Sequence, residues 1–597
     1  MTGSGLENHL DPTSGKANAS SAHHRRRQLL KIQPRKTRRP VRVQLLSPAS
    51  IWGRASRVPP HAPQENKRRT RETCSSLAGH VGHRQLTCRR RDGRPWFDDN
   101  RHSAPLCLSA QAASRRADGP PAMDTLCRSP AGHGARGQPL RHSSKPIFTL
   151  PVPGSRIYVV TEPSLAATVQ RSAKTLSFTP LVPDITQRVL GLDKETVKVV
   201  RQNLDPEPGE PRGFLADVHD LVYGLLGPGE YLNSLSCEAS QELCLQLDEY
   251  ATSIIEQPER KGHAVDLLGF VRHIVTVGTA KYFYGPRNPI AVEPDLENAF
   301  WDFDHGLGGL MIGILPSLTA RKAFRGREAM VAGLIRYIEA GYEADAAQIV
   351  KGRIRIERQY GFNTEMSARS SLSFFFAGVV NTTTTTFWAA LRLFADESLL
   401  RAVRSEIQAA LALSEETTGP ATLSLAILKD KCVTLLAVLR ESLRVGSENF
   451  SVRLVKEDMR LGGRYFLRKG SVVQIAGGVI HADKTIWGDD VDTFNPQRFL
   501  TAKSGSGIHP AAFRGFGGGK TLCPGRHFAT TEIMVFAAMI VHSFDMFSAD
   551  GGPVRVPVKN DRVMPVHVLE PKPEDCPEVV LKPRAEATML KTLQIVV

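Results

Sequence analysis

Charge and apolar periodicity divide the chain near residue 145, and this division limits what it can fold into. Residues 1–145 hold 28 of the 77 Lys and Arg residues but only 9 of the 60 Asp and Glu residues, a net charge of +19. The rest of the chain holds 49 basic and 51 acidic residues, a net charge of −2. The first part lacks apolar periodicity, so it cannot bury enough surface to offset its ordering entropy. We expect a basic, disordered segment over 1–145 and one folded domain over 146–597.

A basic segment of this kind suggests nucleic-acid binding through phosphates or a transit peptide. Aromatic residues are scarce in it, no nucleic-acid motif is present, and 145 residues is long for a presequence. We therefore expect no nucleic-acid partner. A segment without a function of its own, with Met123 as a later start, is the favoured interpretation.

The pattern of the remaining residues predicts mainly helices with small β-sheets, an α+β fold. Two β-rich runs, 146–150 and 156–160, flank Pro-Gly-Ser and predict a hairpin. Helical patterns follow, and residues 446–478 read as strands broken at Gly462-Gly463 and Lys469-Gly470. The clearest predicted helices cover 240–256, 264–283, 329–340, 396–413 and 523–545. No apolar run reaches the roughly 18 residues of a transmembrane helix.

The strongest local motif surrounds Cys523, in Phe-Gly-Gly-Gly-Lys-Thr-Leu-Cys-Pro-Gly-Arg over residues 516–526. Three consecutive glycines allow positive φ and a close approach to a flat ligand. Cys523 stands just ahead of an apolar helix, whose N-terminal N–H groups would stabilise a thiolate. Such a thiolate suits the axial position of haem iron. A glycine-rich loop around an inert, buried cysteine is the alternative.

This motif resembles the cysteine pocket of the cytochrome P450 family, Phe-x-x-Gly-x-x-x-Cys-x-Gly. Phe516, Gly519, Cys523 and Gly525 match it. The resemblance implies haem b with an axial thiolate from Cys523. The family's basic position two before the cysteine is a threonine here, and Lys520 beside it is expected to contact a haem propionate instead.

Further motifs agree with the family in their order along the chain. Glu441 and Arg444 match its Glu-x-x-Arg, and a Pro-Gln-Arg-Phe segment supplies Arg498 as the third member of the same network. Arg453 matches a position that contacts a propionate through a charge-assisted bond. These residues are expected to brace the fold beneath the haem and to hold its acidic edge.

The helix on the oxygen side is expected at residues 372–386. Gly378, Asn381 and Thr382 take the places of the family's glycine and its acid–alcohol pair, so the acid has become an amide. An amide does not titrate at neutral pH, so a proton relay would need Thr382 and water. The Asn-Thr pair followed by Phe387-Trp388 resembles the branch of sterol 7α- and 12α-hydroxylases and prostacyclin synthase.

The resemblance implies a monooxygenase that oxidises an apolar small molecule, such as a terpenoid, a sterol or a related secondary metabolite. It would use O2 and electrons from a separate NADPH-cytochrome P450 reductase. A haem-thiolate isomerase or dehydratase that needs no reductase is the alternative, and a non-enzymatic protein is the third hypothesis. The family implies the endoplasmic reticulum surface, with peripheral membrane contact but no anchor in this chain. Residues 306–315 are read as a core helix or, alternatively, as a segment facing a membrane or an access route.

Overall fold

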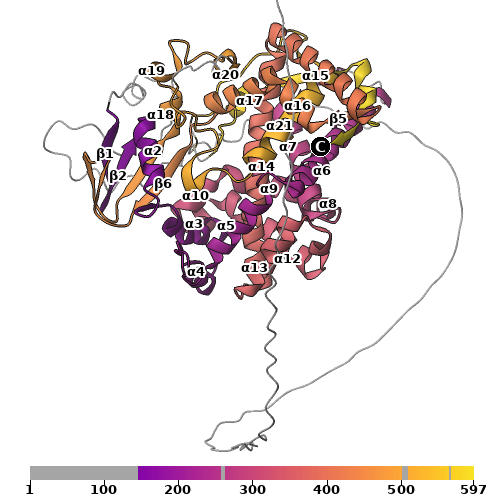
Figure 1. Ribbon diagram of the computed structural model, residues 1–597. Helices are drawn as coiled ribbons and strands as arrows, with labels where there is room; N and C mark the ends of the chain where they lie inside the picture. The colour runs from indigo at the N-terminus through magenta and orange to yellow at the C-terminus, as the bar shows by residue number, and fades with distance from the viewer. Residues whose placement is uncertain (1–144, 153, 257–261, 501–507, 562, 564–566) are drawn as a thin grey trace, which may run out of the picture. The chain divides into compact units, whose positions relative to one another are not determined.

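The computed structural model describes residues 145–597 except 153, 257–261, 501–507, 562 and 564–566 (Figure 1). Helices make up most of this part and small sheets accompany them, so the predicted α+β class is confirmed. Residues 1–144 lie outside the described part, and the disorder and boundary expected there stay predictions. None of the described helices is long and apolar enough to span a membrane.

A five-stranded sheet joins the first strands to the last third of the chain. Its strands, in spatial order, are β1 (Ile147–Val152), β2 (Ser155–Val160), β9 (Val472–Ala476), β6 (Phe450–Val455) and β3 (Leu176–Ser177). β1 and β2 pair antiparallel, which confirms the predicted hairpin. β2 pairs in parallel with β9, and β9 pairs antiparallel with β6. Leu165 and Val169 of α2 (Pro163–Arg171) share the buried core of this sheet.

The long helix α14 (Thr364–Phe394) is the centre of the helical part. Around it pack α7 (Leu267–Tyr284), α12 (Arg321–Glu339), α17 (Val433–Gly446) and α21 (Arg526–Ser543). Its side chains are buried on most sides, as an all-round apolar pattern predicts. Five consecutive threonines do not interrupt it, because the hydroxyls of Thr384 and Thr385 donate to carbonyls one turn earlier.

The remaining elements surround this centre. The longer helices are α3 (Val182–Leu190), α5 (Phe214–Leu225), α6 (Glu230–Glu256), α9 (Leu296–His305), α13 (Gln348–Gln359) and α15 (Glu397–Thr418). The smaller sheets pair β7 (Met459–Leu461) with β8 (Tyr465–Leu467), β10 (Phe544–Ser548) with β11 (Glu578–Pro583) and β4 (Val265–Asp266), and β12 (Gln594–Val596) with β5 (Thr422–Ser424). The predicted helices are present, with ends displaced by up to ten residues.

The segment after α9 divides between core and surface, so its interpretation as a core helix is only half right. Leu307 and Leu310 of α10 (Leu307–Ile312) are buried. Gly313, with φ of 71°, then ends the helix. Ile312, the last residue of α10, and Ile314, Leu315 and Leu318 after it point outward and are 64–73% exposed.

A buried ion network connects α17 to the polypeptide that leads into the cysteine loop. Arg444 donates through Nε and Nη2 to the two carboxylate oxygens of Glu441, each at 2.7 Å. Arg498 adds a bond to Glu441 Oε1 at 3.1 Å, and the Asn495 N–H adds another at 3.0 Å. The network expected from the sequence therefore exists, and its central carboxylate is fully buried.

His481 extends this network to the cysteine loop. Arg444 donates to the His481 carbonyl at 2.8 Å, and His481 Nε2 accepts from the Arg514 N–H at 2.8 Å. Burial lowers the pKa of His481 to about 3, so its imidazole is neutral and Nε2 has a lone pair to offer. The Arg514 carbonyl in turn accepts from the N–H of Gly517 at 3.0 Å.

Replacing Glu441 by alanine leaves the buried Arg444 guanidinium without its carboxylate, while Arg498 keeps its ion pair with Asp490. We expect Glu441→Ala to lower the free energy of unfolding by about 3–5 kcal/mol. Glu397→Ala is the matched control, because its arginine partner lies 3.6 Å away and both side chains are exposed. It should cost under about 1 kcal/mol. Urea unfolding followed by circular dichroism measures both, and equal losses would contradict the role given to the network.

Candidate functional site

The cysteine loop is closed on itself by backbone hydrogen bonds. The N–H of Cys523 donates to the carbonyl of Phe516 at 2.9 Å, and the Phe516 ring is half-buried against the helical core. Gly517 and Gly519 have φ of 77° and 63°, the left-handed region predicted from the consecutive glycines. α21 begins at residue 526, so the cysteine lies just ahead of the helix, as expected, and Gly525 forms the helix N-cap.

The thiol of Cys523 is free and mostly buried, and the other described cysteines are free as well. Burial raises the pKa of this thiol, while the Gly525 N–H and the charge of Arg526 lower it. The predicted stabilisation of a thiolate is therefore present, but burial outweighs it in the chain alone. Coordination to a metal ion removes the proton from a thiol outright, so this site suits a metal-bound sulfur.

Two buried arginines stand beside the loop without a carboxylate partner among the described residues. Arg453 is 4% exposed and donates to the Val452 carbonyl and, at 2.6 Å, to Thr521 Oγ1. Arg514 is 1% exposed, and its Nη2 lies 3.3 Å from Ser451 Oγ. Burial lowers the pKa of Arg514 to about 10, and the nearby charge of Arg453 adds to the effect. Paired buried cations of this kind suit a dianionic ligand such as the two propionates of haem.

Lys520 was expected to take the propionate contact, but the structure leaves this residue exposed. Thr521, at the position where the family has a basic residue, receives the hydrogen bond from Arg453 instead. The burial of the arginines favours them over Lys520 for holding an acidic group. The sequence pattern identified Arg453 and missed Arg514, whose only signal is a cation inside the apolar run Ala-Ala-Phe-Arg-Gly-Phe.

Two further polar groups against the loop were also missed. The Tyr223 hydroxyl of α5 donates to the carbonyl of Leu522, the residue before the cysteine. The amide Nε2 of Gln170 in α2 is buried and has no hydrogen-bond partner within the described part of the chain. It lies so close to Gly518 that a Cβ there would meet it at 2.1 Å. Neither residue belongs to a motif, because each reaches the loop from a distant helix.

α14 presents an exposed stripe within an otherwise buried stretch. Ala377 and Asn381, four residues apart on one face, are exposed, whereas Val379 and Val380 are fully buried. The Oδ1 atom of Asn381 accepts from the Val568 N–H at 3.1 Å. The two side chains are therefore accessible, and α14 also packs against α21, the helix that follows the cysteine loop.

Gly378 and Thr382 lie off this stripe. A Cβ on Gly378 would meet the Phe283 ring at 3.1 Å and Thr279 at 3.4 Å, so this glycine allows α7 and α14 to approach. Thr382 is only 5% exposed. These contacts favour Asn381 as the accessible polar residue, and give the other two residues a packing role.

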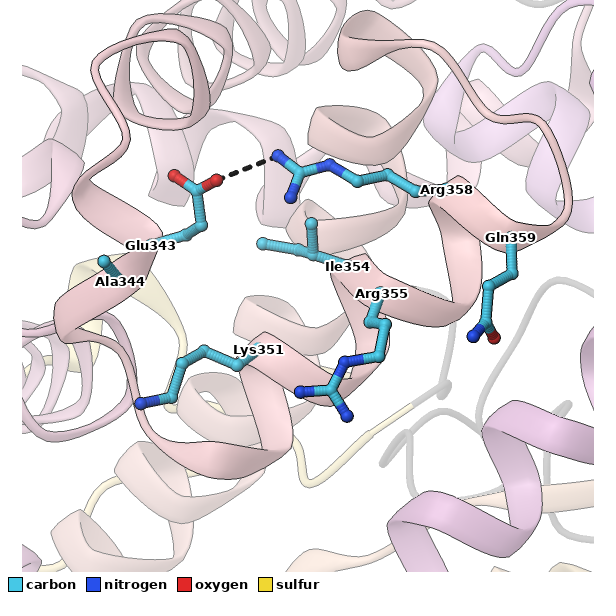
Figure 2. Close-up of a pocket in the computed structure, with 7 residues that line it drawn as sticks. All are labelled: Glu343, Ala344, Lys351, Ile354, Arg355, Arg358 and Gln359. Carbon is cyan, nitrogen blue, oxygen red and sulfur yellow. Dashed lines mark hydrogen bonds and ion pairs between the residues drawn. The ribbon is translucent and has the colours of Figure 1, made fainter.

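A separate hollow of about 510 Å³ lies on α13 (Figure 2). Lys351 and Arg355 line it, and Arg358 closes one side through its ion pair with Glu343 at 2.8 Å. No residue of the cysteine loop or of α14 contributes to its lining. It is therefore a surface feature apart from the candidate site.

Comparison of the sequence with known proteins relates the chain to one family. The sequence model of the family named Cytochrome P450 matches residues 348–574, which include α14, the ion network and the cysteine loop. "Cytochrome P450 monooxygenase nodJ" of Hypoxylon pulicicidum is 30% identical over 67% of this chain and 76% of that protein. A "Cytochrome P450 monooxygenase" of Gibberella zeae is 26% identical over 75% of this chain and 81% of its own length.

A mammalian relative matches a smaller part of the chain. "Cholesterol 7-alpha-monooxygenase" of Cricetulus griseus is 26% identical over 42% of this chain and 52% of that protein. It bears out the expected likeness to sterol hydroxylases, although the match spans only about half of that enzyme. Together, the matched motifs, the fold and the relatives show that the chain belongs to the cytochrome P450 family and is a monooxygenase enzyme.

Proposed function

We propose that the chain binds haem b through Cys523 and oxidises an apolar small molecule of the terpenoid or sterol class. The observation that carries this proposal is the pair of buried arginines, 453 and 514, beside a loop that presents a mostly buried thiol. Haem would use both features, because its iron takes a thiolate ligand and its two propionates pair with the two arginines. Haem with a thiolate ligand supplies the activation of O2 when bound.

The chain's own residues then have separate tasks. Arg453 and Arg514 would hold the acidic edge of the haem, and Phe516 with the glycines shapes the loop that carries Cys523. Tyr223 fixes the loop carbonyl next to the cysteine. Asn381 and Ala377 of α14 would form a wall of the space in which an apolar substrate is oriented.

Asn381 takes the polar place on this wall. Its oxygen already accepts from Val568, so its Nδ2–H groups are the part that can orient a water molecule or a substrate oxygen. An amide neither gains nor loses a proton near neutral pH, so protons must pass through water held there. The same property favours the alternative function, an isomerase or dehydratase that rearranges an oxygenated substrate without external electrons.

Electrons for the monooxygenase reaction are expected from a separate NADPH-cytochrome P450 reductase. The sequence has no flavin or dinucleotide fingerprint of its own. Names of the fungal relatives identify them as monooxygenases, which supports oxidation over rearrangement.

We also propose that the exposed apolar segment after α10 contacts a membrane surface such as that of the endoplasmic reticulum. Ile314, Leu315 and Leu318 expose about two thirds or more of their surface. Arg321, Lys322 and Arg325 follow at the start of α12 and are exposed. An apolar patch beside a basic one suits the interface of a bilayer with anionic lipids.

The haem ligand is tested by the carbon monoxide difference spectrum of residues 123–597 after reduction. We expect the red-shifted Soret band of a thiolate-ligated haem in the wild type and its loss in Cys523→Ala. Cys432→Ala is the control, because it removes another buried free thiol. A band that survives in Cys523→Ala would contradict the ligand assignment, and a well-folded wild type without the band would overturn the proposed function.

The wall residues are tested after a panel of terpenoids and sterols has been screened for a spin-state shift of the haem. With reductase and NADPH, we expect Asn381→Ala to lower product formed per NADPH on the order of tenfold. Thr382→Val should stay near the wild-type value because its side chain is buried. A larger loss in Thr382→Val than in Asn381→Ala would contradict this assignment and make Thr382 the proton-relay residue. Turnover without reductase would establish the isomerase or dehydratase alternative.

Flotation with phosphatidylcholine–phosphatidylserine vesicles tests the membrane contact. The double variant Ile314→Ser and Leu318→Ser should bind at least about tenfold more weakly, since two large apolar side chains are lost from the interface. Phe466→Ser is the control, a 50% exposed aromatic residue on β8. Equal losses, or no binding by the wild type, would contradict the proposal.

A further inference from the structure

A second group of metal-ligating side chains lies outside the haem site. Asp304 and His305 end α9, and Glu570 comes from the segment before β11. One ligand atom from each of the three lies within 4.8 Å of the others. They line a cavity of about 650 Å³, which Arg272 and His567 also line.

Asp304 is the residue that most needs a partner. It is 2% exposed, and neither carboxylate oxygen has a hydrogen-bond partner among the residues that the structure describes. The ring nitrogen Nε2 of His567 lies 3.4 Å from Oδ1. A buried carboxylate without a donor is costly unless a cation compensates it.

His567 directs its Nε2 at the Asp304 carboxylate. Its Nδ1 lies 2.9 Å from the Val568 carbonyl, so Nδ1 carries a proton. Burial lowers the pKa of His567, but the contact with Asp304 raises it overall, so in the metal-free chain a second proton on Nε2 pairs with this carboxylate. A metal ion would replace that proton. A ring nitrogen fixed by an N–H bond to a backbone carbonyl is the usual state of a metal-ligating histidine.

His305 faces two partners that make opposite demands on one ring nitrogen. Its Nε2 lies 3.2 Å from Glu570 Oε2 and 2.9 Å from the guanidinium Nη2 of Arg272. One ring nitrogen cannot donate to the carboxylate and accept from the guanidinium at once. A metal ion between Nε2 and Oε2 satisfies both lone pairs.

We propose that Asp304, His305 and Glu570 bind a divalent metal ion of the zinc class, with His567 as the fourth ligand. Two imidazoles and two carboxylates are a usual ligand set for zinc, at about 2.0–2.2 Å from the ion. The donor atoms of Asp304, His305 and Glu570 already lie within 4.8 Å of one another, and His567 Nε2 lies 3.4 Å from Asp304, so small side-chain rotations reach that geometry. The site is independent of the haem proposal, since it shares none of its ligands.

Arg272 is the competitor of the metal ion. Its Nη2 donates to Glu570 Oε1 at 2.5 Å, and its guanidinium lies 4.7 Å from the centre of the Trp301 ring. It therefore leaves Glu570 Oε2 available, but it must release His305. Removing this positive charge should strengthen metal binding.

The site would also steady the wall of the haem pocket. His567 adjoins Val568, whose N–H bonds Asn381 at 3.1 Å. A metal ion on His567 therefore fixes the segment that orients the Asn381 amide. Asp304 lies on α9, and Glu570 accepts from Arg272 of α7, so the cluster links this segment to both helices.

The test uses the full-length chain equilibrated with Zn2+, dialysed and counted for zinc by mass spectrometry, with iron counted separately. We expect the wild type to retain one zinc ion more per chain than Asp304→Asn or His305→Ala. His305 is 45% exposed in its side chain, so His305→Ala should fold even if Asp304→Asn does not. Cobalt in place of zinc should give visible absorption bands that the same variants lose.

Glu297→Gln is the matched control, because Glu297 and His273 form a pair at 2.9 Å between the same two helices, α9 and α7. It should retain the wild-type zinc content. Arg272→Met should bind zinc more tightly than the wild type, on the order of tenfold. Equal zinc in the wild type, Asp304→Asn and His305→Ala would overturn the site, and so would loss of zinc from Arg272→Met.

Discussion

The buried carboxylate of Glu441 is the group on which the arrangement around the cysteine loop depends. It accepts from Arg444, Arg498 and the Asn495 N–H, so a charge with no access to water has all its bonds inside the protein. Arg444 passes the connection to His481, and His481 passes it to Arg514. A network of this kind is stable only when every member is satisfied, so it allows few arrangements of the loop.

The polar groups near the loop differ from this network, because the chain by itself leaves several of them without a hydrogen-bond or charge partner. The arginines at 453 and 514 lack carboxylates among the described residues, and Gln170 Nε2 lacks an acceptor. The thiol of Cys523 is buried where its anion is disfavoured. Such deficits are destabilising unless a ligand compensates them, which is why they indicate a binding site.

The same reasoning extends to the cluster behind α9. Asp304 is buried beside His567 Nε2 at 3.4 Å, and His305 places one ring nitrogen between a carboxylate and a guanidinium. His567 belongs to the cluster, and the next residue, Val568, donates to the Asn381 side chain. The cluster and the proposed haem pocket therefore share one short segment of chain. The two proposed sites are thus connected through one hydrogen bond, from the Val568 N–H to the Asn381 side-chain oxygen.

The sequence by itself determined the fold class, the cysteine loop with its glycines and the Glu441, Arg444 and Arg498 network. These depend on residues close together in sequence or on spacings that reflect helical geometry. Only the tertiary structure decided which side chains are accessible: Asn381 is exposed, whereas Thr382 is buried. It also revealed Arg514, Tyr223 and Asp304, whose roles come from burial against distant elements. A linear pattern records residue types and spacing, but the free energy of a buried charge depends on neighbours that only folding brings together.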